Sequence, residues 1–79
     1  MTADQLKALI SAGLACDHLE LEGDGRHWFA TIVSAEFEGL RLLQRQRLVY
    51  ATLGNKMDTD EVHALSMKTF SPTEWARQA

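Results

Sequence analysis

Two histidines are the residues of this chain whose type and spacing could do chemistry. His27 opens a segment, 27–33, that is rich in aromatic and β-branched residues, and His63 opens an alternating segment, 63–70. About thirty residues with helical character separate the two segments, which is the length that a parallel crossover needs and a hairpin does not. Paired as neighbouring parallel strands, the segments would bring both imidazoles to one end of a sheet, on backbones ~4.8 Å apart.

Two neutral imidazoles at one sheet end could bind a transition metal or one iron of a cluster. They would not close the site, because structural zinc usually takes four protein ligands, so a partner chain or a small molecule would have to complete the coordination shell. In the alternative interpretation, His27 is an exposed residue beside the loop Gly23–Gly25, and His63 is half buried with its ring hydrogen-bonded to backbone. The residues alone leave both interpretations open.

Cysteine chemistry is less well supported. Cys16 and His18 form a Cys-x-His pair, a pattern too short to be specific, and the acidic charges of Asp17 and Glu20 would oppose ionisation of the thiol. The sequence favours an ordinary packed thiol over a reactive one. Because no Ser/His/Asp arrangement, Cys-x-x-Cys motif or paired carboxylates accompany it, we expect a protein that is not an enzyme.

Positive side chains suggest a different kind of site. Arg41 and Arg45 lie one turn apart on an expected helix, and Lys68 lies on an expected strand, so the three are candidate contacts for nucleic acid or for an acidic partner. A solvated surface is the alternative. The formal net charge of −3 gives no global basic field that would draw the chain onto phosphates or anionic lipid.

Composition sets the limits within which these groups must be positioned. The 79 residues support one domain, 1–79, and 46% hydrophobic with 24% charged residues is ordinary for a chain that folds. A single cysteine excludes an internal disulfide framework and fits a reducing compartment. No secretory leader or membrane-spanning apolar stretch is visible, so we expect a cytoplasmic protein without a membrane segment.

The first half of the chain predicts a helix and a hairpin. Thr2 with Gln5 makes a capping box for an amphipathic helix that Gly13 can end. The alternating segment 18–22, a Gly-Asp-Gly turn and the segment 27–33 indicate two antiparallel strands. Within the second strand, the neighbours Trp28 and Phe29 must point to opposite faces, which can leave one of them on a recognition surface.

The second half predicts two helices, a strand and a closing helix. The segment 40–53 contains no Gly or Pro and places Leu42, Val49 and Leu53 on one stripe, and residues 58–61 can form about one further helical turn. After the strand 63–70, the sequence Ser71-Pro-Thr-Glu74 is typical of a helix start. The order αββααβα follows, an α+β fold with a three-stranded mixed sheet and helices packed on one face.

The same segments resemble a known family. Arg45-Gln-Arg-Leu-Val-Tyr50 is similar to the arginine-rich helix signature of the BolA family, and His63-Ala-Leu-Ser is similar to its strand motif. Glu22-Gly-Asp-Gly and Phe37-Glu-Gly39 occur in the matching order, so the resemblance covers nearly the whole chain. It is strongest with the bacterial branch that contains acid-responsive BolA-like proteins.

The resemblance implies a class II KH-like fold and a partner. BolA proteins associate with monothiol glutaredoxins through a bridging [2Fe–2S] cluster, for which the glutaredoxin and glutathione provide thiolates. The family pattern implies that His63 is one ligand and that His27 takes the place of the His or Cys in the loop before the second strand. An adaptor in iron–sulfur cluster trafficking or in iron, redox and stress regulation is therefore expected, with no cluster on the isolated chain.

The chain departs from the family pattern at Gln46, where many BolA relatives have histidine, which leaves the cluster ligands intact but removes a polar contact from the helix. It also lacks the Gly-x-x-Gly loop with which KH domains clamp a nucleic-acid backbone, and this bears on the alternative function, a KH-like nucleic-acid-binding transcriptional regulator. We therefore expect nucleic-acid binding, where it occurs, to be weak. The sequence leaves self-association into a homodimer open.

Overall fold

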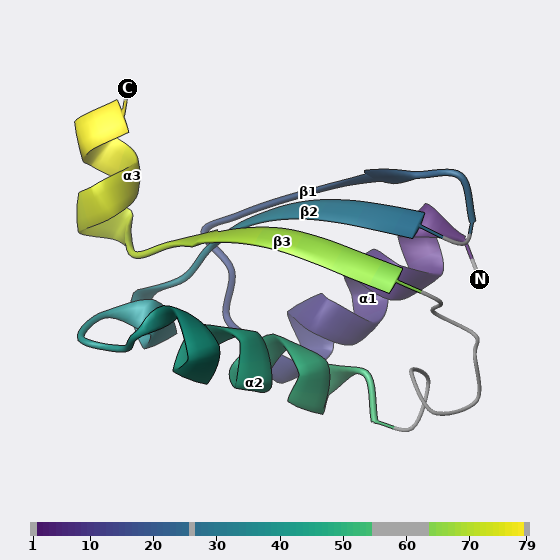
Figure 1. The fold of residues 1–79 in the computed structure, drawn as a ribbon, viewed down its shortest axis with the longest axis horizontal. Coiled ribbons are helices and arrows are strands. Elements are labelled where there is room, and N and C mark those ends of the chain that lie inside the picture. The colour runs from purple at the N-terminus through teal and green to yellow at the C-terminus, as the bar shows by residue number, and fades with distance from the viewer. Residues whose placement is uncertain (1, 26, 55–63, 79) are drawn as a thin grey trace.

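The computed structural model describes residues 2–25, 27–54 and 64–78, which form three α-helices, a short 3₁₀ turn and one three-stranded sheet (Figure 1). The helical turn expected at 58–61 and the residue His63 lie outside the described residues. No helix in the described ranges is long and apolar enough to cross a membrane.

Helix α1, Ala3–Gly13, begins at the predicted capping box. Thr2 Oγ1 accepts a hydrogen bond from Gln5 N at 3.2 Å, and Gln5 Oε1 accepts one from Thr2 N at 2.9 Å. This reciprocal pair satisfies two amide groups that a helix start leaves without partners. One face of the helix then buries Leu6 and Ile10 completely.

The sheet has the predicted mixed topology. Strands β1, His18–Gly23, and β2, His27–Val33, pair antiparallel, and β3, Ala64–Phe70, pairs parallel with β2, which is therefore central. Helix α2, Leu42–Thr52, makes the crossover between β2 and β3, after a 3₁₀ turn at Ala35–Phe37 that the sequence analysis did not predict. The register sets His27 opposite Ala64 and Val33 opposite Phe70.

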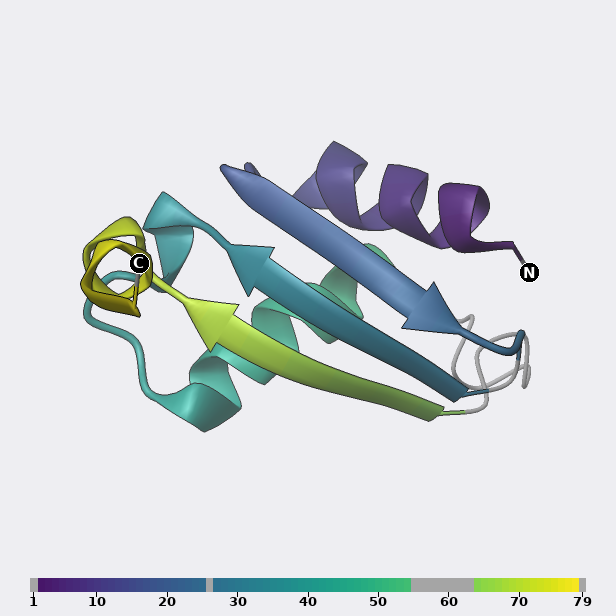
Figure 2. The same ribbon diagram turned by 90° about the horizontal axis from the view of Figure 1, so that it is seen from above.

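Helices α1 and α2 cover one face of this sheet (Figures 1 and 2). The core lies between these two helices and the sheet. Its buried side chains are Leu6, Ile10, Leu14, Trp28, Ala30, Ile32, Phe37, Val49, Leu53 and Leu65. The predicted stripe of α2 is therefore confirmed for Val49 and Leu53 but wrong for Leu42, which is 59% exposed. At that end of α2, the side chain of Arg45 lies against β3, and the first turn of the helix faces solvent.

Helix α3, Pro72–Gln78, stands apart from the other two. It rises at the end of β3 on the side of the sheet opposite α1 and α2 (Figure 1). The Trp75 ring stacks on His18, with 4.9 Å between ring centroids, and lies 5.4 Å from the ring of Phe70. The predicted packing of helices on one face thus holds for α1 and α2, and α3 instead closes one end of the opposite face.

Arg45 joins three elements. Its Nε donates to Leu40 O at 2.9 Å, and its Nη1 donates to Thr69 O at 3.2 Å and to Glu74 Oε1 at 2.7 Å. From the same helix, Tyr50 Oη donates to Leu65 O at 3.4 Å. These two side chains of α2 therefore bind carbonyl groups of the edge strand β3, which reduces the capacity of that edge to pair with another chain.

The Arg45–Glu74 pair makes a prediction for acid stability. Hydrogen bonding from Arg45 and from the Ser71 amide lowers the pKa of Glu74 from its ordinary value of 4.5 to about 2. Because the folded-state pKa is the lower one, this stabilisation is complete above pH ~4.5 and is lost as the pH falls towards 2. We expect the urea midpoint of Glu74→Gln to lie below that of the parent at pH 7, and the gap to close near pH 2.

Glu38→Gln serves as the control, since the exposed Glu38 side chain forms no ion pair with the described residues. A gap between parent and Glu74→Gln that stays constant from pH 7 to pH 2 would contradict the role given to the Glu74 carboxylate.

Candidate functional site

His27 stands at the start of β2, next to a tight loop. Asp24 Oδ1 accepts a hydrogen bond from His27 N at 2.9 Å, which closes the turn between β1 and β2. Gly25 has a φ of 98°, a conformation that favours glycine, and a Cβ built on Gly23 would lie only 2.3 Å from His27 O. The sequence Gly-Asp-Gly is therefore needed to bring the backbone this close to His27.

The imidazole of His27 is oriented by the same aspartate. Asp24 Oδ2 lies 3.7 Å from His27 Nδ1, which is beyond hydrogen-bond length but close enough for electrostatic attraction. A carboxylate on that side favours the tautomer with the proton on Nδ1, which is the tautomer that binds a metal through Nε2. The His27 side chain is 57% exposed, so a partner can reach it.

The parallel register of β2 and β3 bears on His63, the second predicted ligand. His27 is the register partner of Ala64, and one peptide bond joins Ala64 to His63. His63 itself lies outside the described residues, so the pairing of the two imidazoles stays a prediction. Within the described ranges, no group of three or more His, Cys, Asp or Glu side chains is arranged to hold a metal ion.

The three basic residues predicted as contacts do not form one surface. Arg45 is engaged within the fold, with 11% of its side chain exposed. Arg41 is exposed before the first turn of α2, whereas Lys68 lies on the opposite side of the sheet. The structural role of Arg45 could not be predicted from the sequence, because helical spacing does not say which neighbour fills the space beside a residue.

The thiol of Cys16 has an ordinary environment. It is half-buried, and Sγ donates to Leu14 O at 3.4 Å. Burial raises the pKa of this thiol, and the charges of Glu36 and Asp17 raise it further. The predicted effect of the acidic neighbours is confirmed in direction, although Glu36, distant in sequence, takes the part that we assigned to Glu20. A raised pKa disfavours the thiolate that nucleophilic chemistry requires.

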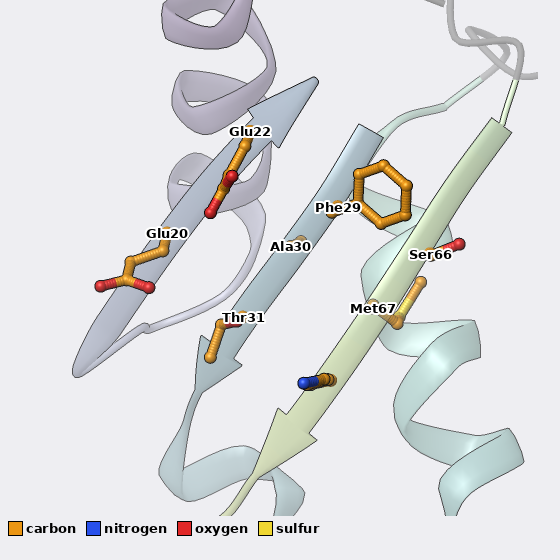
Figure 3. A pocket seen from close by; sticks show the side chains of 8 residues that line it. Glu20, Glu22, Phe29, Ala30, Thr31, Ser66 and Met67 are labelled. Atoms are coloured by element: carbon orange, nitrogen blue, oxygen red, sulfur yellow. The ribbon is translucent and has the colours of Figure 1, made fainter. Parts of the chain in front are cut away.

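A feature of the open sheet face was missed by the sequence analysis. Figure 3 shows the Phe29 ring standing over the sheet, with Glu20 and Glu22 on β1 to one side and Ser66 on β3 to the other. These residues, with Ala30, Thr31, Met67 and Lys68, line a hollow of about 360 Å³. The two glutamates of the alternating segment 18–22 were the available signal. The structure also shows which of the two neighbouring aromatic residues is exposed, since Trp28 is buried and Phe29 faces solvent.

Comparison with known proteins agrees with this architecture. The family model described as BolA-like protein matches residues 10–74. The chain belongs to the BolA family. BolA-like protein 2 of Mus musculus is 37% identical over 83 residues, which cover 99% of this chain and 94% of the mouse protein.

Other BolA relatives extend the comparison. The acid stress protein IbaG of Escherichia coli K12 is 29% identical over 77 residues, which cover 98% of this chain and 92% of that protein. The solved structure of a BolA homologue from Coxiella burnetii superposes with a TM-score of 0.85 at 42% identity, covering 98% of this chain and 99% of that one. The BolA fold is therefore present over essentially the whole chain.

Two variants of Asp24 test the orientation of His27 in this BolA protein. Asp24→Asn keeps an oxygen that can accept from His27 N, so its stability should match the parent, whereas Asp24→Ala removes that acceptor and should lose about 1 kcal/mol. Both variants remove the carboxylate, so long-range ¹H–¹⁵N NMR should show less Nδ1–H tautomer at His27. His18, whose Nε2 lies 3.2 Å from Glu20 Oε1, is the internal control. An unchanged His27 tautomer in both variants would contradict the orienting role.

Proposed function

We propose that this BolA protein is a non-enzymatic adaptor that binds a monothiol glutaredoxin and shares a bridging [2Fe–2S] cluster with it. The observation that supports this most is the parallel pairing of β2 with β3, which places exposed His27 level with the residue that follows His63. The role would lie in iron–sulfur cluster trafficking or in iron, redox and stress regulation.

The division of ligands follows from coordination chemistry. A [2Fe–2S] cluster takes four protein or thiol ligands, and His27 and His63 supply at most two nitrogens from this chain. Thiolates of the glutaredoxin and of glutathione would supply the others. Histidine in place of thiolate raises the reduction potential of an iron and makes ligation sensitive to protonation, which suits a cluster that is exchanged or sensed.

Two observations other than the placement of the histidines support the proposal. The Asp24 carboxylate lies on the Nδ1 side of His27, as carboxylates do beside many metal-bound histidines. The name of the Escherichia coli relative, acid stress protein IbaG, is in keeping with the stress part of the proposed role.

Cluster reconstitution tests the histidine pair. Purified alone under anaerobic conditions, the chain should be colourless, and together with a monothiol glutaredoxin and glutathione it should give cluster absorption with two irons and two sulfides per complex. His63→Ala should remove one of the two proposed ligands and shorten the cluster lifetime by about tenfold or more, while His27→Cys should be tolerated because thiolate is also an iron ligand.

His18→Ala is the matched control, because His18 is the third histidine of the chain and lies against Trp75, on α3. Spectra and lifetimes that are the same for His63→Ala and the parent would overturn the proposed site, as would a stable stoichiometric cluster on the isolated monomer.

Nucleic-acid binding has less support than the adaptor function. The guanidinium of Arg45 binds Thr69 and Glu74, and the net charge is −3. We expect binding to a DNA duplex to be weak and to fall steeply between 50 and 200 mM salt, as phosphate contacts do. Fluorescence anisotropy at several salt concentrations measures this. Tight, sequence-selective binding at physiological salt would instead favour the regulator.

A further inference from the structure

Phe29 is the large apolar side chain that the described part of the sheet leaves in solvent. It is 59% exposed, and the other large exposed hydrophobic residues of the described ranges, Leu42, Leu43 and Tyr50, all lie on α2. Phe29 follows His27 by two positions in β2, so both side chains project from the same face, about 6.6 Å apart along the strand. A protein that brings a thiolate to an iron at His27 must therefore come close to the Phe29 ring.

The surface around Phe29 has the character of a protein contact and not of a small-molecule pocket. The hollow of about 360 Å³ is open to solvent, and its lining combines Phe29, Ala30 and Met67 with two carboxylates, two hydroxyl groups and an ammonium group (Figure 3). A small-molecule site instead places only a few polar groups in a mostly apolar, concave wall. Neither Glu22 nor Lys68 forms an ion pair with a described residue. These charges are available to a partner.

The charged side chains of this surface are arranged asymmetrically, with acidic residues on β1 and a basic residue on β3. Glu20, Thr31 and Lys68 form one row across the three strands, with the backbones of Glu20 and Lys68 about 9.6 Å apart. An occupant that is electrostatically complementary carries a cationic group over β1 and an anionic group over β3, which fixes its orientation on the sheet.

The available area has two ends. At one end, α3 closes the face, because Trp75 lies against His18 and Phe70. At the other end stands His27. We define the docking face as the area that comprises Glu20, Glu22, Phe29, Thr31, Ser66 and Lys68. We propose that this docking face binds the glutaredoxin that supplies the missing iron ligands, with Phe29 as the apolar anchor. This inference rests on the proposed function.

A second copy of this chain is the competing occupant. The row Glu20–Thr31–Lys68 is complementary to itself across a two-fold axis parallel to the strands. The docking face offers only six side chains, however, whereas stable protein interfaces use roughly 20–30 residues a side. A glutaredoxin that reaches His27 also contacts the sheet end beside the docking face, and metal bonds add to its stability when a cluster is bound, so a small face suffices for it.

Matched variants test the docking face. Phe29→Thr replaces the anchor with a residue that also suits a strand, and Leu42→Gln removes an equally exposed apolar side chain from α2. Likewise, Lys68→Glu reverses a charge on the docking face, and Arg47→Glu does so on α2. Thermal unfolding first establishes that each variant is folded. Calorimetric titration with a monothiol glutaredoxin and glutathione, with and without cluster, then gives Kd.

We expect Phe29→Thr to weaken glutaredoxin binding by about tenfold or more, with or without cluster, and Lys68→Glu to weaken it in a salt-dependent way. Leu42→Gln and Arg47→Glu should bind as the parent does. In ¹⁵N spectra of the parent, added glutaredoxin should shift the amides of Phe29, Thr31, Ser66 and Lys68 more than those of α2.

The outcomes separate this inference from the proposed function. If His63→Ala loses the cluster while Phe29→Thr binds as tightly as the parent, the docking face is wrong and the adaptor function stands. If Phe29→Thr weakens glutaredoxin binding but no shared cluster forms, the docking face stands and the cluster proposal fails. A parent that binds no glutaredoxin, or dimerises through Phe29 by light scattering, overturns the inference.

Discussion

The parallel pairing of β2 with β3 is the constraint on which this structure depends. A hairpin would place the start of β3 beside the end of β2, at Val33, and far from His27. The crossover through α2 instead sets Ala64 beside His27, and the core between the sheet and the helices, with Trp28 and Leu65 paired in the register, fixes that alignment. A shift of the register by one residue would turn these side chains away from the core, so burial protects the alignment on which the proposed ligand pair relies.

A second constraint comes from Arg45 on α2, which lies in the segment that resembles the arginine-rich helix signature of the BolA family. Its guanidinium binds Thr69 on β3 and Glu74 on α3, so it holds the edge strand and the closing helix together. The docked α3 in turn places Trp75 over one end of the open sheet face. A residue that looked available for phosphates therefore shapes the surface that a protein partner would meet.

Much of the fold could be predicted from the sequence because the deciding signals are local. The Thr2 capping box and the Gly-Asp-Gly turn act within a few residues, and segment length alone favours a parallel crossover over a hairpin. Periodicity could not predict that Leu42 faces solvent, nor which of Trp28 and Phe29 is buried. It shows which residues share a face of a helix or strand, but not whether another element covers that face. The ligand pair was predicted through the topology, and ligation by His27 and by His63 stays a prediction.

The most direct test is electron spin-echo spectroscopy of the reduced mixed complex, in which only this chain carries ¹⁵N. Nitrogen ligation from this chain predicts ¹⁵N couplings of directly bound imidazole, and these should diminish in His63→Ala and again in the double variant that also carries His27→Cys. A reduced cluster whose spectrum shows no bound ¹⁵N would contradict the account, because neither His27 nor His63 would then be a ligand.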